Sequence, residues 1–258
     1  MSDGIRLDDR VAVVTGAAGV IGTATMHLLA ERGARIIAVD RREQDLKNAI
    51  VNLPPSAQAL AIAADVTDED EVAGYVRAAV DAFAAIDVFC NNAGVEGEVK
   101  PITDYSLEAF RRVIDVNVIG VFLGLKQVLP VMLKQDKGSI INTASIAGLI
   151  GSPQLAVYSA SKQVMGLTNS AAWECTGTGV RVNCVCPGLI DSRMPSAILQ
   201  GRNGGNASVP TEKIVERIPA RRLGLASEVA SVVAFLASDE ASYVSGSAYA
   251  VDGGRTAA

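Results

Sequence analysis

Seven short apolar runs alternate along this chain with longer segments in which apolar residues recur at helical spacing. Such runs are typical of strands buried on both faces, and such strands belong to parallel sheets covered by helices. The sequence therefore predicts an α/β fold: a doubly wound parallel sheet of about seven strands with helices on both faces. No linker divides the chain, so a single domain over 1–258 is expected. The predicted strands are 11–15, 35–40, 59–64, 88–91, 139–143, 180–186 and 248–251, and the predicted helices lie near 20–32, 42–52, 69–83, 106–134, 155–177 and 226–237.

A glycine-rich turn joins the first predicted strand to the first predicted helix. Its sequence is Thr15-Gly16-Ala17-Ala18-Gly19-Val20-Ile21-Gly22. Backbone N–H groups and a helix N-terminus in such a turn can bind a pyrophosphate. Asp40 ends the next strand, roughly 20 residues further on, where a carboxylate can accept hydrogen bonds from a ribose. The order of strand, glycine turn, helix, strand and acid predicts a dinucleotide site, although the spacing of the glycines is not G-x-G-x-x-G. The alternative is a tight turn followed by a surface acid.

Tyr158 and Lys162 stand one helical turn apart, and Ser145 lies just after a predicted strand. A tyrosine with its ordinary pKa of about 10 is a poor base at neutral pH. A lysine at i+4 faces the same side of a helix, and its ammonium near the phenol oxygen would favour the phenolate. A serine hydroxyl nearby could hold the oxygen of an alcohol or ketone. The three residues predict a proton-transfer site, although a tyrosine and a lysine at this spacing also occur by chance.

The overall composition narrows the choice of partners. A net charge of −5 without a long basic run argues against nucleic acid or an anionic membrane. No stretch is expected to span a membrane, and the polar N-terminus shows no secretory signal, so a cytoplasmic location is expected.

Histidine and cysteine usage argues against a metal centre. His27 is the only histidine, which leaves a histidine-rich metal site or a Ser-His-Asp triad with little support. Cys90, Cys175, Cys184 and Cys186 lack metal-site spacing and are expected to be small buried apolar residues. A G-K-[ST] phosphate loop is also missing from the sequence, so nucleotide hydrolysis is not expected.

Further short segments follow these motifs in a fixed order. Taken together, they are Thr15-Gly16 to Gly22, Asp65-Val66, Asn91-Asn92-Ala93-Gly94, Asn117, Ser145, Tyr158-Ser159-Ala160-Ser161-Lys162, Asn183, Pro187-Gly188 and Asp252-Gly253-Gly254. In order and spacing, over nearly the whole chain, they resemble the short-chain dehydrogenase/reductase family, whose fold is a Rossmann-type sheet. Two positions depart from the family pattern: Val20 stands where the family usually has glycine, and Ser192 where it usually has threonine.

The resemblance implies four catalytic residues. Tyr158 would accept the proton of the alcohol, and Ser145 would hold the substrate oxygen. Lys162 would lower the pKa of the tyrosine and bind the nicotinamide ribose. Asn117 would lie at a local break in the 106–134 helix, where an exposed carbonyl holds a water of a proton relay; a simple helix irregularity is the alternative.

The resemblance also implies an NAD site. Asp65 would bind the adenine amino group, with Val66 against the ring, although capping of the next helix by Asp65 or Thr67 is an alternative. The turn after Pro187 would face the nicotinamide, with the Ile190 backbone on its carboxamide; turn chemistry alone explains Pro-Gly equally well. The expected cofactor-binding residues are Gly16, Gly19, Val20, Ile21, Gly22, Asp40, Arg41, Asp65, Val66, Asn92, Ala93, Gly94, Tyr158, Lys162, Pro187, Gly188, Ile190 and Ser192.

The segment 189–223 is the one long irregular stretch, and it follows a strand at the end where ligands bind in such sheets. It is predicted to be a mobile substrate lid, less ordered at 201–206 without ligand; a surface loop without function is the alternative. The pocket beneath it should be mostly apolar, while Glu96 and Gln154 could recognise a second polar group, such as the other oxygen of a diol or dione. Its expected walls are Val95, Glu96, Ile146, Ala147, Gln154, Leu155 and Leu189.

The sequence and this resemblance thus predict an NAD-dependent oxidoreductase that interconverts a small-molecule secondary alcohol and its ketone. The segments Val95-Glu96-Gly97 and Gly120-Val121-Phe122-Leu123-Gly124-Leu125-Lys126 resemble family members that act on cyclic or aryl alcohols and ketones. One alternative is an NADPH-dependent reductase of acyl-carrier thioesters, in which Arg41 and Arg42 would meet a 2′-phosphate that Asp40 would repel. The other is a non-catalytic NAD-binding regulatory module. By resemblance, a homotetramer built through the 106–134 and 155–177 helices is expected.

Overall fold

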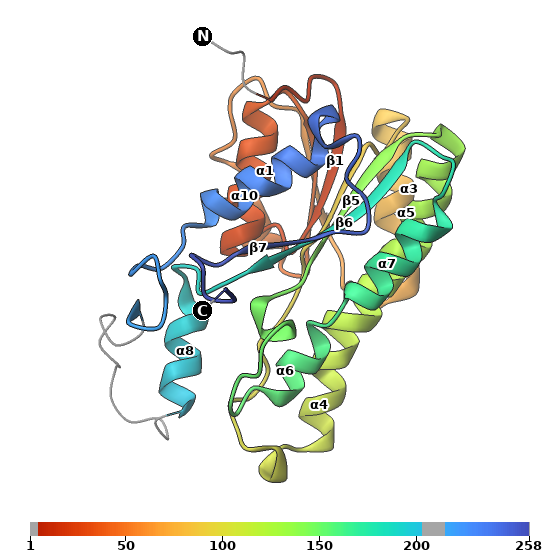
Figure 1. Cartoon of the computed structure of the whole chain (residues 1–258). Helices are drawn as coiled ribbons and strands as arrows, with labels where there is room; N and C mark the ends of the chain where they lie inside the picture. Colours follow the sequence, from red (N-terminus) through yellow and green to blue (C-terminus); the bar gives the residue numbers. More distant parts are fainter. Residues whose placement is uncertain (1–4, 203–214, 258) are drawn as a thin grey trace.

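One seven-stranded sheet forms the centre of the molecule (Figure 1), in a computed structural model that describes residues 5–202 and 215–257. The strand order is β3-β2-β1-β4-β5-β6-β7, and every neighbouring pair is parallel. The order reverses between β1 and β4, which is where a doubly wound sheet opens a crevice for ligands. The predicted Rossmann-type sheet is confirmed. Its strands are β1 (Val11–Thr15), β2 (Arg35–Asp40), β3 (Ala59–Ala63), β4 (Val88–Asn91), β5 (Gly138–Thr143), β6 (Val180–Pro187) and β7 (Ala248–Val251).

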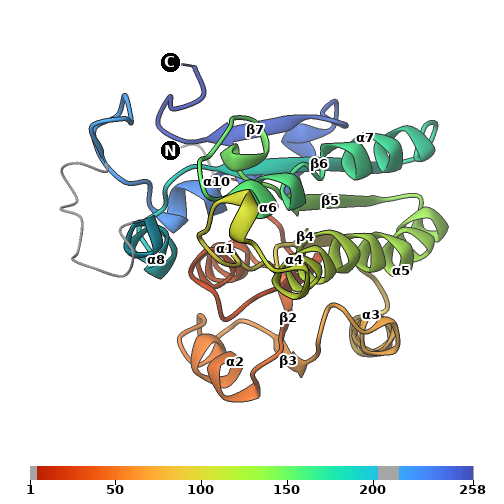
Figure 2. The same cartoon turned by 90° about the horizontal axis from the view of Figure 1, so that it is seen from below.

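Helices cover both faces of the sheet (Figures 1 and 2). Helices α1, α2 and α10 pack on one face, and α3, α5 and α7 pack on the other. The remaining helices, α4, α6 and α8, extend beyond the end of the sheet (Figure 1). The bounds are α1 (Val20–Glu31), α2 (Glu43–Ile50), α3 (Glu69–Phe83), α4 (Leu107–Ile114), α5 (Gly120–Gln135), α6 (Ala156–Ser161), α7 (Met165–Glu174), α8 (Arg193–Arg202) and α10 (Ala226–Ala237).

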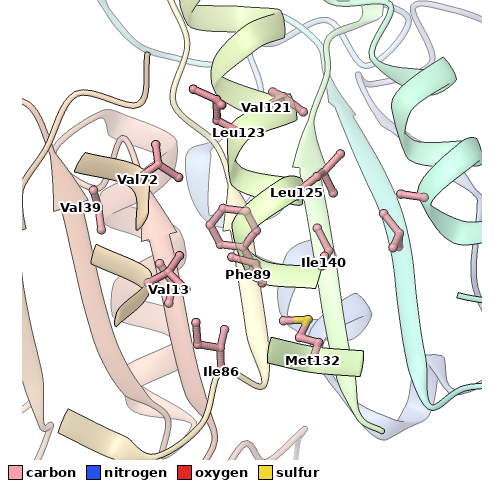
Figure 3. Packing of buried hydrophobic residues seen from close by; sticks show 14 of the residues in the cluster. Val13, Val39, Val72, Ile86, Phe89, Val121, Leu123, Leu125, Met132 and Ile140 are labelled. Carbon is pink, nitrogen blue, oxygen red and sulfur yellow. The ribbon is translucent and has the colours of Figure 1, made fainter. Parts of the chain in front are cut away.

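The core consists of two clusters, one on each face of the sheet. Successive side chains of a strand point to opposite faces, so Val11 and Val13 of β1 belong to one cluster and Ala12 and Val14 to the other. Figure 3 shows the first cluster, in which Phe89 packs among side chains of the neighbouring strands and of α5. Burial on both faces explains why these strands read as continuous apolar runs.

Three helical regions differ from the prediction. A π-helix, Asp115–Ile119, separates α4 from α5 within the predicted 106–134 helix. The predicted 155–177 helix is two helices, because α6 ends at Ser161 and α7 begins at Met165. The lid segment 189–223, expected to be irregular, begins with the helix α8. Its predicted less ordered part, 201–206, lies mostly outside the described residues.

The stretch from α4 to α5 also corrects the expectation about membrane spans. Among the described residues it is the one helical stretch, of 29 residues, whose length and apolar character match a span. Its buried side chains, such as Val121 and Leu125, pack against the sheet within the first core cluster. Core packing accounts for its apolar character, so the match is weak evidence for a membrane segment.

Candidate active site

The glycine turn and the loop after β4 follow the carboxyl ends of β1 and β4. Helices α6 and α8 lie at the same end of the sheet (Figure 1). Gly16 has a φ of +63°, and a Cβ there would lie 2.9 Å from Ala93 Cα. A Cβ on Gly22 would lie 2.1 Å from the Gly16 carbonyl oxygen. Both positions therefore require glycine, and the turn is held tightly against the loop after β4.

The N-terminus of α1 suits a phosphate group. Gly19 is the N-cap and no side chain caps this end, so the first N–H groups of the helix lack side-chain partners. Val20, which replaces the usual glycine of the family, is 48% exposed and does not crowd the turn. Thr15, which the sequence reasoning gave no role, braces the turn: its Oγ1 accepts hydrogen bonds from Asn92 N (2.9 Å) and Ala93 N (3.1 Å).

Asp40 ends β2 beside this turn. Its Oδ2 accepts a hydrogen bond from Ala18 N at 3.1 Å, which fixes the carboxylate next to the glycine turn. Arg42 forms an ion pair of 2.7 Å with Asp45, while Arg41 is exposed. The glycine cradle, the uncapped helix end and the carboxylate beside them fit the pyrophosphate and ribose of a dinucleotide.

Asp65 and Val66 follow β3 near the same edge. The Asp65 carboxylate accepts hydrogen bonds from Thr67 N (2.9 Å) and Thr67 Oγ1 (2.8 Å). The alternative of helix capping by Asp65 or Thr67 is wrong, because Asp68 is the N-cap of α3. Val66 is buried and faces Gly120, where a Cβ would lie 3.0 Å from the valine side chain.

Asn117 lies in the π-helix and is completely buried. Its Nδ2 donates to Val95 O (2.8 Å) and to Ser161 Oγ (2.9 Å), and its Oδ1 accepts from Val95 N (2.8 Å). The predicted break in the helix is therefore present as the π-helix. The Asn117 side chain connects the loop after β4 to α6. Gly94 completes the contact: a Cβ there would lie 2.9 Å from Lys162 Nζ and 3.2 Å from Asn117 Oδ1.

Tyr158 and Ser145 lie together in a nearly dry environment. They are 8% exposed each, and Ser145 Oγ accepts a hydrogen bond from Ala147 N at 3.1 Å. Burial raises the pKa of Tyr158, a hydrogen bond with Ser145 lowers it, and the negative charge of Glu96 raises it. Burial dominates, so the pKa lies above the ordinary value of 10.0.

In the protein alone, the causes that set the pKa of Tyr158 do not include Lys162. Its ammonium donates to Thr143 O at 2.9 Å. Burial lowers the pKa of Lys162 to about 8, and the charge of Cys186 acts in the opposite direction. Lys162 is the C-cap of the short helix α6, and its N–H bonds to Tyr158 O at 3.0 Å, so the i+4 relation is present although the ammonium bonds to Thr143. Lys162 and Asn117 both lie against Gly94, and a proton relay between them stays a prediction.

The turn after β6 joins the site to the lid segment. A Cβ on Gly188 would lie 2.7 Å from Asp252 Cα, so this glycine permits a close approach of two strands. Ile190 is buried and pairs with Gly224 in a parallel bridge, and Ser192 Oγ donates to Ile190 O at 3.1 Å. Both ends of the lid segment are thereby tied together.

Helix α8 packs over Tyr158, where the apolar pocket is predicted. Ala147, Leu155 and Tyr158 form a cluster with Ile198 of α8, and Met194 and Val99 pack against it. The Met194 sulfur is 4.0 Å from the Tyr158 hydroxyl. The sequence reasoning missed Met194, Ile198 and Val99, although Met194 and Ile198 stand at i, i+4 spacing.

The other predicted wall residues differ in burial. Ile146 is buried, while Val95, Gln154 and Leu189 are half-buried. Gln154 has a φ of +63°, and its carbonyl accepts a hydrogen bond from Lys100 N at 3.0 Å, which holds two loops of the pocket together. A separate cavity of about 70 Å³ beneath Arg222 includes Leu189 but not Tyr158, and it is too small for a substrate.

The four cysteines are free and buried, and Cys186 interacts electrostatically with Lys162. Cys184 and Cys186 alternate with residues of the opposite face on β6, and their sulfurs are 3.9 Å apart. His27 lies apart from the site, where its Nε2 is 3.1 Å from Ala49 O.

Comparison with known proteins agrees with this geometry. A family model described as enoyl-(acyl carrier protein) reductase matches residues 16–256. Levodione reductase from Leifsonia aquatica is 39% identical, with 98% of this chain and 96% of that protein covered. Cyclohexanol dehydrogenase from Acinetobacter sp. (strain SE19) is also 39% identical, with 97% and 96% covered. A 3-oxoacyl-[acyl-carrier-protein] reductase from Thermotoga maritima is 38% identical, with 97% and 99% covered.

Solved structures give the same result. The crystal structure of levodione reductase has a TM-score of 0.94 and 39% identity, with 98% of this chain and all of that chain covered. The structure of NAD⁺-bound xylitol dehydrogenase has a TM-score of 0.92 and 35% identity, with 96% and 99% covered. With the family model, the relatives and the fold in agreement, the chain belongs to the short-chain dehydrogenase/reductase family, whose enzymes act on alcohols or ketones with a nicotinamide cofactor.

Proposed function

We propose that this protein is an NAD-dependent dehydrogenase/reductase that interconverts a small cyclic secondary alcohol and its ketone. The observation that carries the proposal is the buried pair of Ser145 and Tyr158 beneath the apolar residues of α8. A neutral alcohol needs two polar contacts in such a pocket, and most of the remaining predicted wall is apolar, with Glu96 and Gln154 as the exceptions. Similarity to levodione reductase and cyclohexanol dehydrogenase supports a cyclic substrate.

In this proposal, Ser145 holds the substrate oxygen and Tyr158 takes its proton. The bound nicotinamide supplies the acceptor, or in reverse the donor, of the hydride. Asn117 and Lys162 lie against Gly94, which gives the proton a polar path away from the tyrosine. The apolar cover by Met194 and Ile198 excludes water, and exclusion of water strengthens the electrostatic interactions of the site.

Asp40 supports NAD over NADP. Its carboxylate is fixed beside the glycine turn by Ala18 N, where it would accept hydrogen bonds from ribose hydroxyls and repel a 2′-phosphate. The NAD⁺-bound state of the similar xylitol dehydrogenase is consistent with this choice. Arg42 is engaged with Asp45, which leaves Arg41 as the cation nearest in sequence for a phosphate.

The second candidate is an NADPH-dependent reductase of acyl-carrier thioesters. Similarity to the 3-oxoacyl-[acyl-carrier-protein] reductase favours it, at nearly the same identity as the other relatives. The carboxylate of Asp40 opposes it. A non-catalytic NAD-binding module is the third possibility, which the complete set of Asn117, Ser145, Tyr158 and Lys162 opposes.

One experiment separates these functions. Purified protein is assayed with a panel of secondary alcohols and NAD⁺ or NADP⁺, and with an acyl thioester and either reduced cofactor, by absorbance of the reduced nicotinamide. We expect the highest kcat/KM for a cyclic alcohol with NAD⁺. A higher kcat/KM for the thioester with NADPH would reject the proposal, and turnover of any substrate would reject the regulatory module.

We also propose that the protein is a homotetramer that associates through α4, α5 and α7. These helices and the π-helix between α4 and α5 expose large apolar side chains, with Phe110 39%, Ile119 41%, Phe122 48% and Trp173 82% exposed. Such a patch is typical of a protein interface. Light scattering coupled to gel filtration should give four times the mass of 26.7 kDa for one chain; a monomeric mass would contradict the proposal.

A further inference from the structure

Glu96 brings a carboxylate to the edge of the pocket around Tyr158. The preceding residue, Val95, is held by two hydrogen bonds of 2.8 Å with Asn117, so the loop that carries Glu96 is fixed to the catalytic centre. The Glu96 side chain is only 15% exposed. After burial and the hydrogen bond with Ser145, the charge of Glu96 is the third cause that sets the pKa of Tyr158. The carboxylate is therefore within electrostatic range of the phenol.

The partner of this carboxylate comes from α8. Arg193 Nη2 lies 2.7 Å from Glu96 Oε1, although the Arg193 side chain is 75% exposed. The next residue, Met194, has its sulfur 4.0 Å from the Tyr158 hydroxyl. The first turn of α8 thus supplies both the donor to Glu96 and the group that covers the phenol.

A substrate oxygen that bonds to Tyr158 needs the space that the Met194 sulfur occupies. Movement of this first helical turn carries the adjacent Arg193 with it. Glu96 then becomes a largely buried charge that has lost its donor, which is unfavourable unless another donor replaces it. An ionised carboxylate only accepts hydrogen bonds. A hydroxyl group of the substrate can meet this need, whereas a carbonyl or an ether oxygen cannot.

We propose that Glu96 is a specificity-determining residue that accepts a hydrogen bond from a second hydroxyl group of the substrate, which takes the place of Arg193. The inference rests on the proposed function and narrows its substrate class. Among cyclic substrates, diols and hydroxyketones are preferred over mono-alcohols and diones.

The test compares the NAD⁺-dependent oxidation of cyclohexane-1,2-diol, 2-methoxycyclohexanol and cyclohexanol. The methoxy compound keeps the second oxygen but cannot donate. For the wild type we expect kcat/KM for the diol to exceed that for the methoxy compound by about tenfold or more, as for a hydrogen bond to a charged group. Glu96→Leu should remove this preference while cyclohexanol is still oxidised, and Glu96→Gln, which keeps the shape, should reduce it.

Two further variants act as controls. Glu98 lies on the same loop and pairs with Lys100 away from Tyr158, so Glu98→Gln should leave the ratio unchanged. Arg193→Ala should preserve or increase the preference, because it removes the group that the substrate displaces. Loss of the preference in Arg193→Ala with retention in Glu96→Leu would assign recognition to Arg193 and overturn the inference.

The failure of this inference is distinguishable from the failure of the proposed function. Oxidation of cyclohexanol without a diol preference in the wild type overturns the role of Glu96 alone. Absence of NAD⁺ reduction with all three alcohols overturns the proposed function, and the inference with it.

Discussion

Replacement of Lys162 by methionine tests whether the buried ammonium destabilises the fold. Lys162 is 5% exposed, and burial lowers its pKa from 10.5 to about 8. One pKa unit corresponds to about 1.4 kcal/mol, so the burial of the ammonium costs the folded protein about 3 kcal/mol at neutral pH. Methionine keeps an unbranched chain and removes the charge. We expect Lys162→Met to raise the free energy of unfolding by about 1–3 kcal/mol, the lower value allowing for the lost hydrogen bond to Thr143.

The pH dependence of the free energy of unfolding provides a second, independent test of the buried ammonium. At pH 7 the lysine is protonated in both states, so the folded state carries the full cost. Between about 8 and 10.5 the folded protein releases this proton while the unfolded chain keeps it, and stability therefore rises with pH. The advantage of the variant should shrink by about 2 kcal/mol between about pH 7 and pH 9.5. Groups whose pKa burial raises, such as Cys90 with a pKa of about 12, act in the opposite direction but are common to both proteins.

The assay is urea denaturation of both proteins without cofactor, followed by far-UV circular dichroism with a reductant at several pH values. Turnover of Lys162→Met should be lost at every pH, because the polar group beside Asn117 is gone. Equal or lower stability of the variant at pH 7, or a difference that does not change with pH, would refute the burial argument.

Three other predictions concern the active site. Tyr158→Phe should lower kcat by about 10²–10⁴-fold with NAD⁺ affinity by calorimetry nearly unchanged; retention of more than about a tenth of kcat would exclude Tyr158 as the base. The wild type should prefer NAD⁺ over NADP⁺ by about 100-fold in kcat/KM, and Asp40→Ser should shrink this ratio. Because burial raises the pKa of Tyr158, alcohol oxidation at limiting substrate should rise with pH above neutrality; a flat profile would contradict this.

The sheet was predictable because strands that are buried on both faces appear in the sequence as continuous apolar runs. β1, β2, β4 and β7 have the predicted bounds, and the others differ by one residue at an end. The break at Asn117 is different, since the hydrogen bonds of its side chain go to Val95 and Ser161, 22 and 44 positions away in the chain. Periodicity within the helix carries no information about such distant partners. The break at Asn117 was therefore expected only from the resemblance to a family.

The helix α8 was not predicted, because it contains a proline and a glycine. Pro195 is tolerated because it lies in the first turn of the helix, and Gly201 is required because a Cβ there would lie 2.6 Å from Val99. Both residues suggest a loop when the sequence is read locally. Met194 and Ile198, the apolar pair that packs over Tyr158, were consequently missed.

The electrostatics of Tyr158 and Lys162 depend on burial rather than on their spacing. The i+4 spacing predicts an ammonium that lowers the pKa of the phenol, but the lysine lies at the end of α6 and donates to Thr143. Burial disfavours the charged form of each group, so it raises the pKa of the tyrosine and lowers that of the lysine. The first turn of α8 contributes to this burial through Met194. A substrate that displaces Met194 therefore changes the environment of the phenol at the step in which the phenol must take a proton.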